Sequence, residues 1–289
     1  MFGSGNPDRL SLYPRRRSLL KFSYIYYKTI RMTARLLHPC KQVSFAHDPG
    51  DEPAVFVSNH SGISGPCMTT LYYPRPHKTW SISFATDGEH TASYAFHDVF
   101  FGRSRKHQGF YRFLSRIMRH ALPPLLNYSD TIPVYHDRRV VQTFKQSVAA
   151  LSEGEDLVIF GEGPERYSPY INRLQDGFID LGRLYYRRTG KRLRFYPMYV
   201  CKQTRMISVG MPITYDPDLD PQEQRERIGS YLCDGIDALG RAMPAHKPVP
   251  FMKERWYRAY GEYEHDFAAY WNLIAQEGER LNGTSSNRR

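Results

Sequence analysis

The sequence predicts an α/β protein, and two short apolar runs carry most of this prediction. Residues 54–58 (AVFVS) and 156–160 (DLVIF) are continuous runs bounded by turn residues, which is typical of strands buried on both faces. The first run leads into Asn59-His60 and a Gly-rich turn, and the second leads into a Gly-Glu-Gly turn that contains Glu162. Two strand ends that carry a possible base and a carboxylate indicate one active site.

Before the first strand, residues 15–38 contain no Gly or Pro and predict a helix with two unlike faces. Its apolar sector holds Leu19, Phe22, Tyr26, Ile30 and Leu37, and its opposite sector holds Arg17, Lys21, Lys28, Arg31 and Arg35. Such a helix can lie in a membrane interface with its cations on anionic lipid. Packing of the apolar sector on the domain, with the cations in solvent, is the alternative.

A second basic stretch, residues 99–129, has no acidic residue and interleaves six cations with aromatic side chains such as Phe110 and Phe113. Aromatics mixed with cations can stack on nucleic-acid bases or lie among lipid headgroups. An ordinary exposed helix is the third interpretation. The motifs described below favour lipid.

Composition limits the classes of protein to consider. The chain has 289 residues and a net charge of +11, which favours an anionic partner such as nucleic acid, an acidic membrane or a phosphorylated substrate. Its four cysteines form no C-x-x-C pair, which argues against a zinc site or disulfide framework and for a reducing compartment. We expect no signal peptide and no spanning helix, because no run approaches about 18–20 apolar residues.

The motifs occur in an order that resembles the glycerolipid (lysophospholipid) acyltransferase superfamily. The first motif of that family is Asn-His, four residues and then Asp; this chain has Asn59-His60 but Gly65 at the Asp position. Segments similar to the other family motifs follow at 130–138 (DTIPVYHDR), 160–166 (FGEGPER), 195–200 (FYPMYV) and 207–213 (ISVGMPI), with a closing helix expected over 222–239. The resemblance covers roughly residues 40–242.

The resemblance implies a mixed sheet flanked by helices, with an N-terminal amphipathic helix and a C-terminal helix. We therefore expect a membrane-associating segment at 1–39, an acyltransferase-like α/β domain at 40–242, and a C-terminal helix and tail at 243–289. The helix of this last part is expected over residues 253–281, which are rich in Trp and Tyr.

The resemblance also implies an activity. Members move a fatty acyl group from acyl-CoA or acyl carrier protein to a hydroxyl of a lysophospholipid or glycerol phosphate. His60 is then the general base, because an imidazole titrates near neutral pH, and Glu162 is the second candidate catalytic residue. The candidate substrate-binding residues are Asn59, Gly62, Arg138, Arg139, Gly163 and Arg166; the arginines suit an acceptor phosphate. N–H groups of the 62–65 turn could bind the oxyanion. No metal or cofactor is expected.

Gly65 leaves two interpretations of the site open. Another carboxylate takes over the role of the Asp, for which Asp87, Glu89, Asp98 and Glu162 are candidates, or the protein is a catalytically inactive relative that binds lipid. A nucleic-acid-binding protein is a remote alternative, because no recognised nucleic-acid module is present. The expected location is cytoplasmic, peripheral on the inner face of the cell membrane, with anionic lipid as the partner.

Overall fold

The computed structural model describes residues 17–62, 64–86, 90–96, 107–128, 130–249 and 251. The main sheet has eight strands: β1 (Gln42–Phe45), β2 (Val55–Ser58), β3 (His77–Ile82), β4 (Thr131–Val134), β5 (Asp156–Ile159), β8 (Arg194–Cys201), β9 (Met206–Val209) and β10 (Ile213–Thr214). A separate hairpin pairs β6 (Glu162–Arg166) with β7 (Asn172–Leu174). The helices are α1 (Arg17–Leu37), α2 (Ser64–Tyr72), α3 (Ser83–Thr86), α4 (Thr91–Tyr94), α5 (Gln108–Tyr128), α6 (Val140–Ser152), α7 (Asp180–Thr189) and α8 (Pro221–Ala242).

The main sheet is mostly parallel, with strand order β1-β9-β8-β2-β5-β3-β4 and β10 beside β8. The strands β8, β2, β5, β3 and β4 run in one direction, whereas β9 and β10 are antiparallel to β8. The carboxyl ends of β2 and β5 are therefore neighbours at one edge of the sheet. The predicted mixed α/β fold, with its central sheet flanked by helices, is confirmed.

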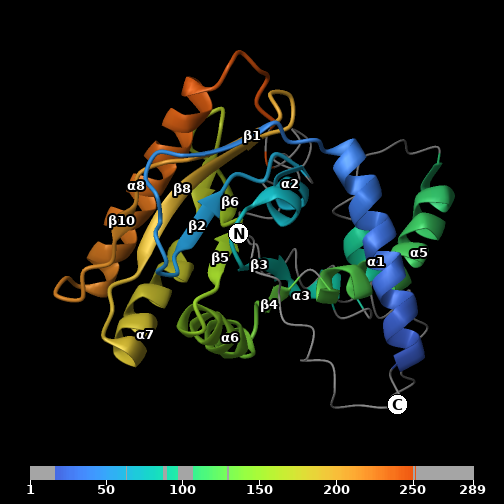
Figure 1. Cartoon of the computed structure of the whole chain (residues 1–289), viewed down its shortest axis with the longest axis horizontal. Helices are drawn as coiled ribbons and strands as arrows, with labels where there is room; N and C mark the ends of the chain where they lie inside the picture. Colours follow the sequence, from blue (N-terminus) through green and yellow to red (C-terminus); the bar gives the residue numbers. More distant parts are fainter. Residues whose placement is uncertain are drawn as a thin grey trace, which may run out of the picture.

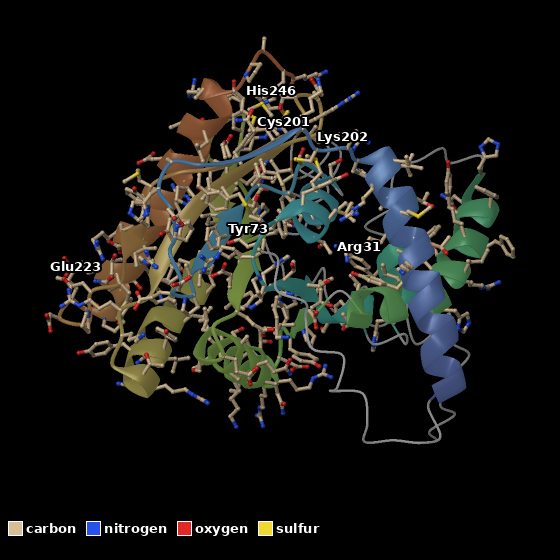
Figure 2. The ribbon with its side chains drawn as sticks, viewed as in Figure 1. Arg31, Tyr73, Cys201, Lys202, Glu223 and His246 are labelled. Carbon is tan, nitrogen blue, oxygen red and sulfur yellow. The ribbon has the colours of Figure 1, made fainter. Side chains whose placement is uncertain are left out.

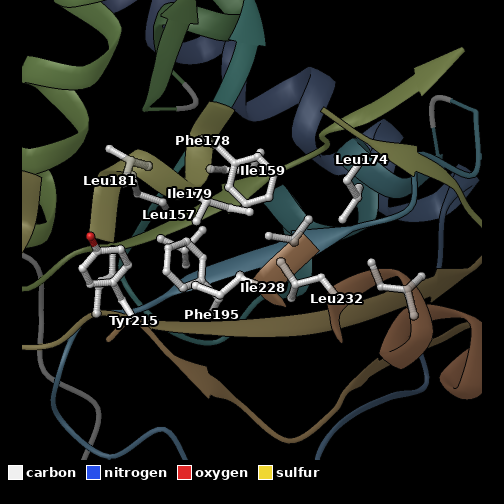
Figure 3. Close-up of a cluster of buried hydrophobic side chains, with 14 of the residues drawn as sticks. Leu157, Ile159, Leu174, Phe178, Ile179, Leu181, Phe195, Tyr215, Ile228 and Leu232 are labelled. Carbon is white, nitrogen blue, oxygen red and sulfur yellow. The ribbon is translucent and has the colours of Figure 1, made fainter. Parts of the chain in front are cut away.

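Both faces of the sheet are covered, and alternate residues of the central strands enter different cores. Val55, Val57, Leu157 and Ile159 pack in a large core with side chains from α6, α7 and α8, part of which Figure 3 shows. Phe56 and its neighbours on the opposite face pack in a second core with side chains from α2. Burial on both faces explains why β2 and β5 are continuous apolar runs, since neither face of these strands meets water.

Helix α8 lies along the sheet on the side of the large core, while α1 and α5 lie together at the other side of the molecule (Figure 1). The Asp220 carboxylate caps α8 by accepting the N–H of Gln222 at 2.8 Å, and Pro221 occupies the first turn. The predicted helices over 15–38 and 222–239 are thus present as α1 and α8. The described helices include none with the combined length and apolar character needed to span a bilayer. The predicted helix over 253–281 lies outside the described residues.

At the amino end of the sheet, the fully buried Asp156 carboxylate joins three segments of chain. It accepts the N–H of Ala54 at 2.9 Å and the hydroxyl of Tyr73 at 2.8 Å. Arg75 donates to both of its oxygens, at 2.6 and 3.2 Å. Burial and the neighbouring Asp156 hold the pKa of the Tyr73 phenol well above its ordinary value, so this hydroxyl remains a donor. This network fixes the starts of β2 and β5, whose other ends carry the candidate site.

Candidate active site

His60 follows β2 and stands at the start of the turn that leads into α2. Asn59 anchors this turn, because its buried side chain accepts the N–H of Val200 at 2.8 Å and donates to the carbonyl of the same residue at 3.2 Å. Both polar groups of Asn59 are therefore used to join β2 to β8. This gives Asn59 a structural role, and its predicted contact with substrate stays a prediction.

Gly65, at the position of the motif Asp, is in very close contact with backbone. A Cβ atom added at Gly65 would lie 2.3 Å from the carbonyl oxygen of His60 and 2.8 Å from that of Asn59. The Gly65 N–H also donates to the His60 carbonyl at 2.9 Å, which closes the turn tightly. No side chain fits here without a rearrangement of the turn. The conformation of this turn therefore requires glycine at position 65.

Glu162 begins β6, directly after the chain leaves β5, and its carboxylate reaches the turn of His60. One oxygen, Oε1, accepts the backbone N–H of His60 at 2.5 Å, and Oε2 accepts the backbone N–H of Asn172 at 2.9 Å. The side chain is only 3% exposed. A carboxylate this deeply buried requires hydrogen-bond donors, and here two backbone groups supply them. Glu162 thus joins the His60 turn to the β6–β7 hairpin.

The same carboxylate lies beside the imidazole of His60. The distance from Nδ1 of His60 to Oε1 of Glu162 is 3.6 Å, just beyond the usual hydrogen-bond range of about 2.7–3.2 Å. Nδ1 is buried without a hydrogen-bond partner, whereas 28% of the side chain is exposed. The exposed part of the side chain therefore lies away from Nδ1. A histidine base requires a carboxylate beside one ring nitrogen and leaves the other for the substrate, and Glu162 supplies the carboxylate.

A pocket of about 180 Å³ has Glu162 in its wall. Its walls come from the β6–β7 hairpin, with Glu162, Arg166 and Asn172 among the polar side chains, and from Val249 and Phe251 beyond α8. Arg166 is exposed at the end of β6 and is the cation of the wall. His60 does not line the pocket itself, but its ring contacts Phe251, which does.

The other two candidate arginines lie farther along the same edge. Arg138 and Arg139 follow β4, which is three strands from β2 in the sheet order and hence about 14 Å away. The guanidinium of Arg139 is paired with Asp137 at 2.7 Å and lies 4.6 Å from the centre of the Tyr135 ring. Arg138 is exposed. The structure thus brings Arg166, but neither Arg138 nor Arg139, to the wall beside His60 and Glu162.

The glycines and the turn N–H groups have local roles. Gly62 has φ +61°, which glycine adopts without strain, and a Cβ at Gly163 would lie 3.2 Å from the Arg173 carbonyl of the facing strand. The N–H groups of Ser64 and Gly65 are bonded within the turn, at 3.3 and 2.9 Å. In the described part of the turn, the Gly62 N–H is then the donor to consider for an oxyanion.

The alternative carboxylates Asp87, Glu89 and Asp98 lie outside the described residues.

Sequence reasoning missed the segment that follows α8. Residues 243–249 and 251, here called the strap, return across the carboxyl end of the sheet and bring Phe251 onto His60, with 4.7 Å between ring centres. The predicted domain of residues 40–242 therefore does not contain all the residues at this site. No periodicity or motif marks the strap, and only the contact itself shows it.

The fold and this site define a mixed α/β protein with a histidine–carboxylate pair at the carboxyl edge of its sheet. The sequence matches no family model and no curated protein. The crystal structure of the 1-acyl-sn-glycerophosphate (LPA) acyltransferase PlsC from Thermotoga maritima is similar to this chain, with a TM-score of 0.41 and 14% identity. The similarity covers 82% of this chain and 86% of that chain. A likeness of this size leaves the function to be argued from the chain's own residues.

Proposed function

We propose that the protein is an acyltransferase that moves a fatty acyl group from a thioester to a hydroxyl of a lysophospholipid or glycerol phosphate. The observation that carries the proposal is the Glu162 carboxylate beside Nδ1 of His60, at 3.6 Å, on an imidazole side chain that is 28% exposed although Nδ1 is buried. The order of motifs along the sequence supports the same activity. Acyl-CoA or acyl carrier protein would be the donor.

In the proposed reaction, Nε2 of His60 takes the proton of the acceptor hydroxyl as its oxygen attacks the thioester carbonyl carbon. The carbon–sulfur bond then breaks, an ester forms, and the proton passes from His60 to the departing thiolate. The negative charge of Glu162 beside Nδ1 stabilises the imidazolium that exists between these steps. Arg166 provides the positive charge that a phosphate-bearing acceptor requires next to the base.

The test is acceptor-dependent release of thiol from acyl-CoA and acyl carrier protein thioesters, with a panel of lysophospholipids and glycerol phosphate. We expect release with at least one acceptor, together with the matching ester by mass spectrometry. The His60→Ala variant, purified identically, controls for contaminating enzymes and should be inactive. Equal release by wild type and His60→Ala would overturn the proposal. No release from any donor, by protein that binds anionic vesicles, would instead favour a non-catalytic lipid-binding role.

We also propose an anionic membrane surface as the partner, and α5 as the helix that contacts it. The side chains of Phe110, Phe113 and Ile117 are 60%, 60% and 47% exposed, and their spacing places them on one stripe of the helix. The exposed cations Arg112 and Arg116 flank the stripe, and α5 contains no acidic residue. Exposed aromatics next to cations, on a helix without acidic residues, suit the interface of an anionic bilayer.

The membrane proposal predicts a loss of binding when the aromatic stripe is removed. Partial burial of two Phe rings in lipid contributes about 2 kcal/mol. Phe110→Ser/Phe113→Ser should therefore weaken binding to vesicles that contain anionic lipid about thirtyfold. Vesicle co-sedimentation measures the effect. Tyr186→Ser, which removes a 37% exposed aromatic from α7, is the matched control and should bind like wild type. Equal binding by all three proteins would exclude the stripe as the contact.

A further inference from the structure

The strap contacts His60 through an aromatic ring that comes from outside the region of motif resemblance. The Phe251 ring lies 4.7 Å from the imidazole at an interplanar angle of 40°, and the Phe160 ring lies 5.2 Å from it at 50°. Phe160 follows β5, so one ring belongs to the sheet edge and the other to the strap. His60 is therefore held by side-chain packing as well as by its own backbone.

This packing matters because, among the residues that the structure describes, none makes a hydrogen bond that fixes the imidazole. Nδ1 lacks a hydrogen-bond partner and lies 3.6 Å from Glu162, and Gly65 has no side chain with which to orient the ring. An imidazole without a hydrogen bond to Glu162 or to a side chain at position 65 is free to rotate about its side-chain torsions unless packing prevents it. Rotation would move Nε2 away from the substrate and Nδ1 away from the carboxylate.

The strap is itself anchored at the end of β8, where Figure 2 shows His246 near Cys201 and Lys202. Nδ1 of His246 donates to the Pro244 carbonyl at 2.9 Å, so its Nε2 accepts the hydroxyl of Tyr199 at 2.9 Å. The backbone of Lys247 makes two hydrogen bonds with the side-chain amide of Gln203, at 3.0 and 3.1 Å. Val249 then lies against Gly62 in the His60 turn. These contacts fix the path that brings Phe251 to His60.

We propose that Phe251 is a positioning residue for His60: its ring, carried by the strap, holds the imidazole with Nδ1 toward Glu162. The strap thus supplies part of the orientation that a carboxylate at position 65 cannot provide. This inference rests on the proposed role of His60 as a base, but the contact between the two rings can be tested without turnover.

The first test is spectroscopic and uses the full chain labelled at histidine, with the His60 ring signals assigned through a His60→Gln variant. Phe251→Leu keeps an apolar side chain but removes the aromatic ring current, so the His60 ring signals should move. Phe251→Tyr keeps the ring and should leave them near their wild-type positions. Unchanged His60 signals in Phe251→Leu would overturn the proposal, whether or not the protein turns over any thioester.

The second test is kinetic. Because misplacement of a base affects the chemical step, Phe251→Leu should lower kcat about ten- to a hundredfold, and Phe251→Tyr should restore most of it. KM should stay within about twofold of wild type, since ground-state binding is not altered. Gln203→Ala, which releases the strap far from His60, should shift kcat in the same direction, whereas the neighbouring Lys202→Ala should not. A loss confined to KM would contradict a positioning role.

Discussion

Replacement of Glu162 by Gln is expected to lower kcat on the order of 10³-fold, because the imidazolium of His60 loses the negative charge beside Nδ1. In the wild-type protein the two carboxylate oxygens of Glu162 accept hydrogen bonds from the backbone N–H groups of His60 and Asn172, whereas the amide of Gln has only one oxygen that can accept. One backbone donor is then left without a partner, which costs about 1–3 kcal/mol of folding stability. Steady-state kinetics and denaturant unfolding of the same preparation measure the two effects.

A structural role of Glu162 has to be separated from its effect on the chemistry. Asn172→Ala serves this purpose, because it removes the 2.8 Å bond from the Asn172 side chain to the Gly163 carbonyl and loosens the same hairpin. The Glu162 carboxylate remains beside His60 in this variant. We expect Asn172→Ala to keep kcat within about tenfold of wild type at a comparable loss of stability. If both variants lose turnover equally, Glu162 acts only as a structural link.

The same reasoning predicts that a carboxylate placed at position 65 does not rescue the Glu162→Gln variant. Gly65→Asp brings a Cβ atom to 2.3 Å from the carbonyl oxygen of His60, so the turn that carries the imidazole has to move. Gly65→Ala should be harmful for the same reason, although it adds no charge. Recovery of turnover by Gly65→Asp in the Glu162→Gln background would show that the missing Asp is the main defect.

Replacement of Asp156 by Asn is expected to destabilise the protein by about 3–5 kcal/mol, because it leaves the Arg75 guanidinium without its buried counter-charge. In the wild-type protein the Asp156 carboxylate accepts hydrogen bonds from Ala54, Tyr73 and Arg75. The NH2 group of Asn is itself a donor and would face one or more of these donors without an acceptor between them. The network ties the starts of β2 and β5 together, so the loss should be global. Equilibrium unfolding in urea measures it.

The exposed pair of Asp137 and Arg139, between β4 and α6, is the control for this prediction. Its atoms are 2.7 Å apart, but its carboxylate side chain is 52% exposed, against 0% for Asp156. Water screens such a pair, so Asp137→Asn should cost less than about 1 kcal/mol. If the two substitutions cost the same, the effect at Asp156 does not arise from burial of the charge.

Periodic and continuous apolar patterns predicted the architecture well, because they reflect which faces of an element meet water. The runs at 54–58 and 156–160 are the central strands β2 and β5, and the predicted helices over 15–38 and 222–239 are α1 and α8. The sequence predicts that His60 and Glu162 follow two strands of the same character, but it leaves Glu162 as one of four candidate carboxylates. The parallel pairing of β2 with β5 brings the Glu162 carboxylate to the imidazole.

Other features depended on contacts between residues that are distant in the chain. The strap brings Phe251 to His60 although the two residues are far apart in the chain and no motif marks the contact. They meet only because the chain returns over the sheet edge.

 The closeness of Gly65 to the His60 carbonyl is likewise a property of the folded turn, and the sequence shows only that the motif Asp is absent.

The sequence by itself determined the fold class and the order of the strands and helices along the chain, and it made His60 and Glu162 candidates that stay predictions. Hydrophobic burial is encoded locally, so these features follow from short stretches of residues. Only the tertiary structure decided that Arg166 lines the pocket while Arg139 is paired with Asp137, and that Glu162 bonds the His60 backbone. Such assignments depend on distances and competing partners between segments that are far apart in the chain, and these exist only once the sheet has formed.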